Sequence, residues 1–269
     1  MNSEQEQRGN ARKKSRRGVV PLVLVIVVLL AVAVGGGYYL VNTYLAEQQA
    51  VKSMEDTATP ATPSKDTPKD ERVQNPIDFA ALEAENSDVF AWMYLPGCSI
   101  NAPVFQSPTD DLFYLTHGAD RQESAVGATF MQLANKQDLS DPVSVIYGHH
   151  IGGEFKDLHN FEDQAFLDAN KEFYVYTPGH ILTYTVVSAY EYDARHILNS
   201  FNFADESVRQ QYFDFVQNPD SMVKAVNANA PKLDADSKLL QLSTCTNEAG
   251  SKTKRYIVSA VQTGDQLTY

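Results

Sequence analysis

Two stretches near the C-terminus decide the expected fold: Leu239-Leu240-Gln241-Leu242-Ser243-Thr244-Cys245, and then Arg255-Tyr256-Ile257-Val258-Ser259-Ala260-Val261. Each is an apolar run of strand length, and the nine residues between them include Asn, Gly and Ser, as a hairpin loop does. Antiparallel pairing of the two runs would bring Cys245, at the end of the first, to the same rim as Arg255, at the start of the second. The sequence therefore predicts a thiol and a guanidinium at one edge of a sheet.

A histidine motif is expected at a second strand end. The residues from Val143 to Tyr147 are typical of a buried strand, and Gly148-His149-His150 follows where that strand must emerge. Side chains alternate along a strand, so His149 shares a side with Tyr147 and His150 points to the other side.

Thiol, imidazole and guanidinium together indicate nucleophilic chemistry. A thiol has an ordinary pKa of about 8.5 and needs an imidazole or a positive field to become a useful nucleophile at neutral pH. A fixed guanidinium stabilises the oxyanion of a tetrahedral intermediate more than it stabilises the neutral substrate. Cys245, His149 and Arg255 are therefore the candidate nucleophile, proton carrier and oxyanion stabiliser.

Each of these residues also has a plainer interpretation. Arg255 alone is typical of a solvated charge at a strand edge, and a lone histidine is more often structural than catalytic. Two cysteines in an exported chain favour a disulfide, so Cys245 joined to Cys98 is the alternative to a free thiol. The six histidines match no HExxH or comparable zinc pattern, so no metal site is expected, and acyl transfer of this kind requires no cofactor.

The N-terminus carries a membrane signal. The first 17 residues hold six basic and two acidic side chains, and charge then disappears until Glu47. The apolar run from Val19 to Leu40 matches the ~20 residues that cross a bilayer as a helix. A cleaved signal peptide, with Ala31-Val32-Ala33 as its cleavage site, is the alternative, but its apolar core would span only ~7–15 residues. We expect an uncleaved single-pass anchor in the cell membrane, with the N-terminus cytoplasmic and the remainder extracellular.

Composition divides the chain into four segments. Residues 1–17 form the cytoplasmic basic segment and residues 18–45 the transmembrane anchor. Residues 46–76 are rich in Thr, Pro, Ser and charged side chains, which is typical of a flexible extracellular linker. Residues 77–269 are enough chain for one catalytic domain. Subtracting the net +4 of the first segment from the total of −12 leaves −16, which argues against a nucleic-acid partner because phosphate binding needs a basic face.

The apolar pattern of residues 77–269 predicts a mostly β fold, an antiparallel barrel or sandwich. One or two short helices are expected at its start, over Ile77–Ala84 and Val89–Tyr94. Helical spacing after Asp205, a plausible N-cap, predicts an inserted helix before the cysteine strand, and a second short helix is expected over Phe155–Asp168. Strands are expected over residues 100–106, 127–131, 143–147, 173–176, 181–192, 239–244 and 256–263.

These motifs resemble those of the sortases, cysteine transpeptidases of Gram-positive cell surfaces, and most closely those of class B. The resemblance rests on Tyr147-Gly148-His149-His150, on Leu242-Ser243-Thr244-Cys245 and on Arg255. Further similar segments are Trp92, Pro96–Gln106, Tyr114-Leu115 and Gly127–Met131, so the similarity covers essentially all of 77–269. Class C enzymes usually add a second hydrophobic span at the C-terminus and an Asp-Pro-aromatic lid motif, and neither is expected here.

The resemblance implies a fold and a set of site residues. The fold is a closed β-barrel of about eight strands with N-terminal helices and a class B helix before the cysteine strand. His149, Cys245 and Arg255 match the family's catalytic positions one by one, whereas His150 inherits no catalytic role. Ser243 and Thr244 line the substrate groove in this interpretation, or are ordinary strand residues in the other. The departures from the family's pattern are Gln241 and Cys98, each where threonine is usual, and Asn101-Ala102 in place of Asp-Tyr.

The resemblance also implies a reaction and partners. The enzyme would cleave a C-terminal sorting motif of surface proteins or pilins after a threonine, through a thioester, and transfer it to an amine of peptidoglycan or of a pilin lysine. An Asn-Pro-containing motif is typical of much of class B. Two rival classes stay open: a surface cysteine peptidase, which releases an acid, and a non-enzymatic adhesin in which Cys98 and Cys245 are joined.

Overall fold

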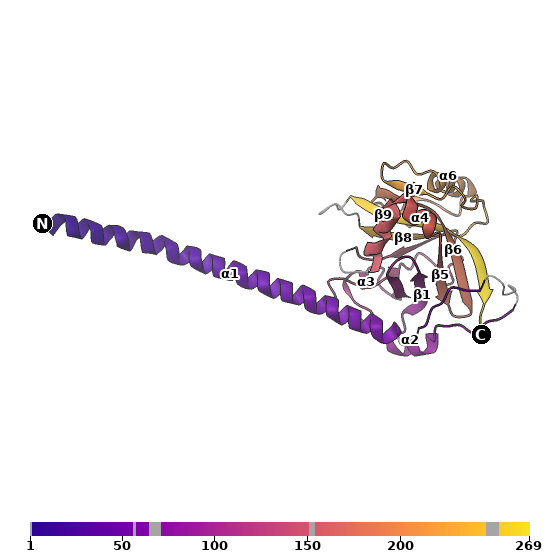
Figure 1. The fold of residues 1–269 in the computed structure, drawn as a ribbon, viewed down its shortest axis with the longest axis horizontal. Coiled ribbons are helices and arrows are strands. Elements are labelled where there is room, and N and C mark those ends of the chain that lie inside the picture. The colour runs from indigo at the N-terminus through magenta and orange to yellow at the C-terminus, as the bar shows by residue number, and fades with distance from the viewer. Residues whose placement is uncertain (1, 56–57, 65–70, 151–153, 246–252) are drawn as a thin grey trace. The chain divides into compact units, whose positions relative to one another are not determined.

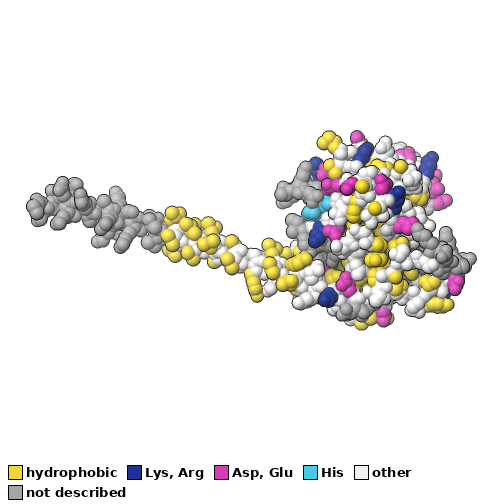
Figure 2. Space-filling model, in the orientation of Figure 1, with side chains coloured by type: hydrophobic (Ala, Val, Ile, Leu, Met, Phe, Trp, Pro, Cys, Tyr) yellow, Lys and Arg dark blue, Asp and Glu magenta, His cyan; other side chains and the backbone are white. Residues whose placement is uncertain are grey.

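The computed structural model describes residues 2–55, 58–64, 71–150, 154–245 and 253–269. The chain forms two compact units, Met1–Leu45 and Ala46–Tyr269. Helix α1 (Asn2–Glu55) contains one stretch, Pro21–Glu55, that is long and apolar enough to cross a membrane. Its large apolar side chains between Leu22 and Val41 are exposed, as the yellow surface in Figure 2 shows. These side chains lie within residues 18–45, the segment expected to anchor the protein.

Eight strands of the second unit close into a barrel (Figure 1). They follow the order β5-β1-β2-β3-β4-β8-β9-β6, pairing of β5 with β6 completes the ring, and β7 extends the sheet beyond β6. The β2–β3 and β4–β8 pairs are parallel and the other pairs are antiparallel. The expected fold class is thus confirmed. The strands are β1 (Val89–Leu95), β2 (Ile100–Phe105), β3 (Phe130–Met131), β4 (Val143–Tyr147), β5 (Glu172–Thr177), β6 (His180–Asp193), β7 (Lys224–Val226), β8 (Leu239–Cys245) and β9 (Lys254–Leu267).

The inserted helix lies where its spacing predicts. Helix α6 (Glu206–Gln217) begins after Asp205, whose carboxylate accepts hydrogen bonds from the backbone N–H groups of Ser207 and Val208. Figure 1 shows α6 at the periphery of the barrel. The other short helices are α2 (Phe79–Glu85), α3 (Phe113–Thr116), the 3₁₀ helix η1 (Glu154–Glu162), α4 (Gln164–Ala169) and α5 (Ile197–Ser200).

Two local expectations were wrong. Val89–Tyr94 is part of strand β1 rather than a helix, and its residues are buried on both faces from Val89 to Met93. A run that is apolar on both faces shows neither the helical nor the strand period, so periodicity alone cannot assign it. The single helix expected over 155–168 is two, because the carboxylate of Asp163 caps α4 and separates it from η1.

Alternation along β8 and β9 separates two cores. Leu240, Leu242 and Val258 join side chains from β1, β2, β5 and β6 in the cluster that fills the barrel. Leu239 and Ile257 point the other way, into a cluster that α6 covers with Tyr212, Phe213 and Val216. Cys245 and Arg255 continue the outward-facing alternation of Gln241, Ser243, Ile257 and Ser259. The barrel wall therefore presents the expected site on its outer face.

Residues expected to form a solvated linker contact the barrel instead. The division of the chain into the segments 1–17, 18–45, 46–76 and 77–269 stays a prediction, but the described part of 46–76 is not free of contacts. Val51 and Met54, three residues apart on α1, are buried in one cluster with Phe79 and Trp92. The backbone N–H of Val73 donates to the Leu267 carbonyl oxygen. Two apolar residues are enough to pack this end of α1 against the cluster, because they lie on one face of the helix.

The departures from the family pattern are accommodated by packing. Asn101 accepts a hydrogen bond from the indole N–H of Trp92 and donates one to Glu55. Gln241 is fully buried, and its amide accepts from the Tyr212 hydroxyl at 2.9 Å and donates to the Ser259 and Tyr190 hydroxyl groups at 3.0 and 3.2 Å. The larger side chain on β8 is therefore compatible with the core because its polar atoms are satisfied.

Gln241→Leu should destabilise the fold. The substitution keeps the approximate volume but removes the Gln241 acceptor from the buried Tyr212 hydroxyl and leaves the Ser259 hydroxyl with only that of Tyr190, which costs ~1–3 kcal/mol in the free energy of unfolding. The measurement is urea unfolding of the full chain in detergent micelles, followed by fluorescence of Trp92, the single tryptophan, which is fully buried. The control Gln211→Leu, at an exposed position of α6, should change stability by less than ~0.5 kcal/mol. Equal effects of the two changes would contradict the role of the buried network.

Candidate active site

Cys245 and Arg255 face each other across the hairpin of β8 and β9. They are directly paired in the antiparallel register, so their Cβ atoms lie about 4.5–5.5 Å apart on one face of the sheet. Cys245 is exposed and Arg255 is half-buried. The Arg255 guanidinium donates to the carbonyl oxygen of Lys254 at 2.8 Å, which holds its side chain along the strand edge. The expected proximity of thiol and guanidinium is present.

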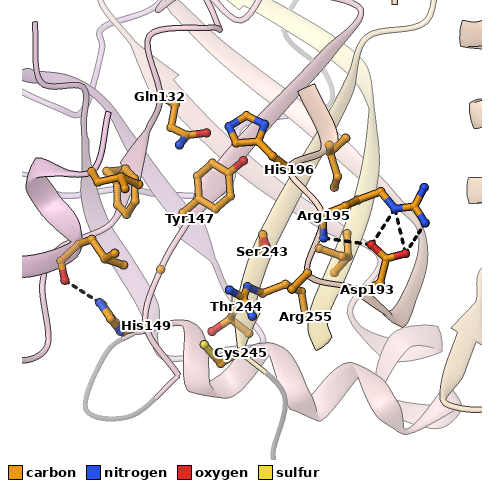
Figure 3. A pocket seen from close by; sticks show the side chains of 17 residues that line it. Gln132, Tyr147, His149, Asp193, Arg195, His196, Ser243, Thr244, Cys245 and Arg255 are labelled. Carbon is orange, nitrogen blue, oxygen red and sulfur yellow. Dashed lines mark hydrogen bonds and ion pairs between the residues drawn. The ribbon is translucent and has the colours of Figure 1, made fainter. Parts of the chain in front are cut away.

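His149 comes to the same pocket from β4. The parallel pairing of β4 and β8 sets Tyr147 beside Ser243, and the backbone N–H of Gly148 donates to the Ser243 carbonyl oxygen. Two residues further along each chain stand His149 and Cys245. The Nε2 atom of His149 lies 2.8 Å from the carbonyl oxygen of Leu115 (Figure 3). A carbonyl oxygen only accepts, so Nε2 carries a proton and Nδ1 is the nitrogen left for proton exchange.

All five sequence-predicted site residues line one pocket. Ser243 and Thr244 contribute the end of the β8 wall before Cys245, and His149 and Arg255 flank the thiol (Figure 3). Both Ser243 and Thr244 are buried. Among the described residues, no group of three or more His, Cys, Asp or Glu side chains is placed to hold a metal ion.

The pocket has walls that the sequence did not predict. Apolar side chains from several elements make most of its surface, and their positions along the chain carry no shared motif. Leu115, Phe130 and Tyr147 belong to segments that resemble the family, so only these three were within reach of the motif comparison. The apolar and aromatic lining residues are Leu112, Leu115, Phe130, Tyr147, Ile197 and Ile257.

A charged pair stiffens the rim opposite His149. Arg195 binds the Asp193 carboxylate through Nε at 2.7 and 2.8 Å and stacks over the rings of Tyr192 and Phe201. His196 follows and caps α5, its Nδ1 accepting from the backbone N–H of Asn199. These residues end β6 and turn the chain into α5, so this rim is held by local contacts (Figure 3).

Tyr147 stays a hydrogen-bond donor in this pocket. Burial raises the pKa of Tyr147 to about 12, with the charge of Asp111 acting in the same direction and that of Arg255 against it. A phenol with a raised pKa remains protonated throughout the neutral range. The pocket therefore offers one neutral phenol hydroxyl among apolar walls.

The two cysteines are separate free thiols, which excludes the disulfide alternative. Cys98 packs against the barrel core with its sulfur 3.6 Å from the Asp157 carbonyl oxygen, whereas Cys245 opens onto the pocket. Burial, followed by the charge of Asp157, raises the pKa of Cys98 to about 12. Cys98 is therefore a protonated packing residue, and of the two thiols only that of Cys245 is exposed.

Comparison with known proteins identifies the family. The sortase domain model matches residues 93–263, which include all the described pocket-lining residues. The chain belongs to the sortase family, whose members are cysteine transpeptidases of cell surfaces. Its relatives further show that it is most similar to class B.

The relatives are class B enzymes from several bacteria. Sortase B of Staphylococcus aureus is 27% identical over 184 residues, which cover 68% of this chain and 73% of that protein. Sortase B of Listeria monocytogenes is 25% identical over 181 residues, covering 66% and 70%. The crystal structure of the S. aureus enzyme superposes with a TM-score of 0.61 at 26% identity, covering 72% of this chain and 89% of that one.

Alkylation should distinguish the two thiols. In the native full chain at pH 7.5, iodoacetamide should modify Cys245 first and Cys98 at least ~100-fold more slowly, because only a small fraction of a thiol with so high a pKa is thiolate. Peptide mass spectrometry gives both rates. Cys98→Ala should leave the fast phase unchanged and Cys245→Ala should remove it. Denatured, unreduced protein should titrate as two thiols. A value of zero would support the disulfide between Cys98 and Cys245 instead.

Proposed function

We propose that this protein is a membrane-anchored class B transpeptidase in which Cys245, His149 and Arg255 carry the chemistry. The observation that supports it most directly is the pairing of Cys245 with Arg255 at the mouth of a pocket that His149 also lines. An exposed thiol, an imidazole with one nitrogen available and a fixed guanidinium are the groups that acyl transfer through a thioester requires.

The first step forms the acyl-enzyme. The Cys245 thiol gives its proton to Nδ1 of His149, its sulfur attacks the carbonyl carbon after a threonine of the sorting motif, and the oxyanion that develops is held by Arg255. The C–N bond then breaks, and His149 donates a proton to the departing amine while a thioester remains on Cys245. The planar guanidinium suits this role because it offers several N–H donors in a fixed geometry.

The second step transfers the acyl group. A primary amine attacks the thioester carbonyl, His149 accepts its proton, and breakage of the C–S bond returns the Cys245 thiolate. The acceptor in this proposal is an amine of cell-wall peptidoglycan, and a pilin lysine is the alternative. Solved relatives support a peptide substrate and an amine acceptor: one structure is a S. aureus sortase B–substrate complex and another is a sortase B complexed with triglycine.

The pocket suits an extended peptide that carries an apolar side chain near the threonine whose carbonyl reacts. Leu112, Leu115 and Ile197 supply apolar walls, and Ser243 and Thr244 line the strand that leads to the thiol. In this proposal Ser243 and Thr244 bind the substrate along this strand. Binding energy along this wall orients the scissile carbonyl at Cys245.

The N-terminal helix supports a membrane location. We assign residues 18–45 as the single-pass anchor, residues 1–17 as its cytoplasmic basic flank and residues 77–269 as the extracellular catalytic domain, with residues 46–76 between anchor and domain. Substrate and acceptor both reach the outer face of the membrane, so an anchored enzyme meets them there.

Product analysis tests the function and separates it from a peptidase. The full chain is incubated with a peptide that has an Asn-Pro-X-Thr core, with and without triglycine, and the products are identified by mass spectrometry. The proposal expects a new amide to triglycine and a thioester adduct on Cys245. Release of the free acid alone, at a rate that added amine leaves unchanged, would identify a surface cysteine peptidase. A pilin-derived lysine peptide in place of triglycine tests the alternative acceptor.

Removal of the nucleophile or the imidazole should have graded effects. Cys245→Ala should abolish the thioester adduct, and His149→Ala should lower kcat/KM by at least ~100-fold, since proton transfer by a positioned side chain contributes ~10²–10⁴-fold. His150→Ala should cost less than ~10-fold, because its ring does not line the pocket. Steady-state kinetics with the peptide and triglycine measure all three. A larger loss for His150→Ala than for His149→Ala would show that the other imidazole is the proton carrier.

Arg255→Lys should lower kcat by ~100-fold with KM changed less. Lysine retains the charge but loses the planar donor geometry, and removal of one oxyanion donor typically costs ~10²–10³ in kcat. The control Arg195→Lys, on the opposite rim and paired with Asp193, should change kcat by less than ~5-fold. Near-normal kcat for Arg255→Lys would mean that Arg255 is a strand-edge charge only.

A further inference from the structure

A second imidazole holds the strand end that bears Cys245. His159, on η1, lies with its Nε2 atom 2.8 Å from the backbone carbonyl oxygen of Cys245. Its Nδ1 atom lies 2.6 Å from the Glu162 carboxylate, and its side chain is only 8% exposed. None of the sequence motifs includes His159, and the described residues that line the pocket do not include it either. It therefore contacts the nucleophilic residue from behind, through the backbone.

This hydrogen bond takes the place of a missing ladder bond. In the parallel pair of β4 and β8, the N–H of Gly148 donates to the Ser243 carbonyl oxygen. Carbonyl groups on one edge of a strand recur every second residue, so the next one on this edge belongs to Cys245. The chain after Gly148 leaves the sheet and carries His149 into the pocket. His159 supplies the donor that β4 would otherwise have provided.

The hydrogen-bond partners fix the orientation of the His159 ring. Nε2 points to the Cys245 carbonyl oxygen and Nδ1 to the Glu162 carboxylate, and both of these groups are hydrogen-bond acceptors. The ring stacks on Tyr256 with centroids 4.6 Å apart and meets the edge of His150 at the same distance. Burial, then the charge of His159, lowers the pKa of His150, with Glu162 acting against them. His159 is thus held by ring contacts as well as by its two polar contacts.

We propose that His159, oriented by Glu162, is a positioning residue for the nucleophile. It binds the Cys245 peptide group to η1 at the point where the β4 ladder ends, and so keeps the sulfur aligned with His149 and Arg255. His159 does not touch the substrate, and its effect passes through the Cys245 backbone. This inference deepens the proposed function. The expected effect on kcat rests on that function, whereas the expected effect on the reactivity of the Cys245 thiol does not.

Three substitutions at His159 separate its contacts. His159→Gln places an amide N–H near the Nε2 position and retains the bond to the Cys245 carbonyl oxygen. His159→Asn places its amide near Nδ1, facing Glu162, and loses the bond to Cys245. His159→Phe keeps the volume and the stacking on Tyr256 and loses both polar contacts. The matched control is His180→Phe, which removes another histidine–carboxylate pair, to Asp265 at 2.7 Å, at the far end of β6 and β9.

The variants are compared in the full chain in detergent micelles, in a Cys98→Ala background so that one thiol reacts. The measurements are the rate of Cys245 alkylation by iodoacetamide, kcat and KM with an Asn-Pro-X-Thr peptide and triglycine, and the Tm. We expect His159→Phe and His159→Asn to lower kcat by ~10–100-fold with KM within ~3-fold, since a small misplacement of a reacting group costs up to ~100-fold. Alkylation should slow in these two variants. His159→Gln should recover both rates to within ~5-fold of the parent, and His180→Phe should change neither.

Two results would overturn the positioning role. One is parental kcat and alkylation rate in both His159→Phe and His159→Asn. The other is a loss of kcat in His159→Gln that equals the loss in His159→Phe, with KM and Tm shifted in both variants. That result is expected for a residue that serves only general packing. Absence of transpeptidation in the parent would count against the proposed function alone, because the order of alkylation rates tests the positioning of Cys245 without any peptide.

Discussion

The double pairing of β8 is the constraint on which the rest of the site depends. One edge of this strand pairs with β4 in parallel and the other pairs with β9 in antiparallel register, so Tyr147, Ser243 and Ile257 lie in line across three strands. That alignment places Arg255 directly opposite Cys245 and brings the chain after β4 level with the thiol. A shift of one residue in either pairing would turn Cys245 or its partner to the inner face of the barrel.

The interior of the barrel explains how this register is kept. Leu240 and Leu242 on β8 are fully buried among side chains from distant strands, and Gln241 between them completes a hydrogen-bonded network with Tyr212 of α6. Slippage of β8 would expose the leucines to the outer layer and bury the amide without partners, which is unfavourable on both counts. Helix α6 therefore supports the site although it contributes no residue to the described pocket lining.

The site has two layers with different chemistry. The front layer, open to the pocket, holds the thiol of Cys245, the imidazole of His149 and the guanidinium of Arg255 beside apolar walls. The rear layer holds the pair of His159 and Glu162 against the Cys245 backbone. His149 bonds the backbone carbonyl group of Leu115, and Arg255 bonds that of Lys254. These hydrogen bonds leave the reactive faces of both side chains toward the pocket.

The features that depend on local order could be predicted from the amino-acid sequence. The two runs around a polar loop predict the pairing of β8 with β9 and hence the neighbourhood of Cys245 and Arg255, and a capping Asp205 with helical spacing predicts α6. Alternation sends His149 and His150 to opposite sides, and the resemblance to the family selects His149 for the site. Tertiary structure alone decided that Val89–Leu95 is a strand, that β5 closes on β6, that Val51 and Met54 pack on the barrel, and that His159 meets Cys245. Those contacts join residues far apart in the chain. The packing of the whole barrel decides which distant surface a buried side chain meets, so no local period or motif can predict it.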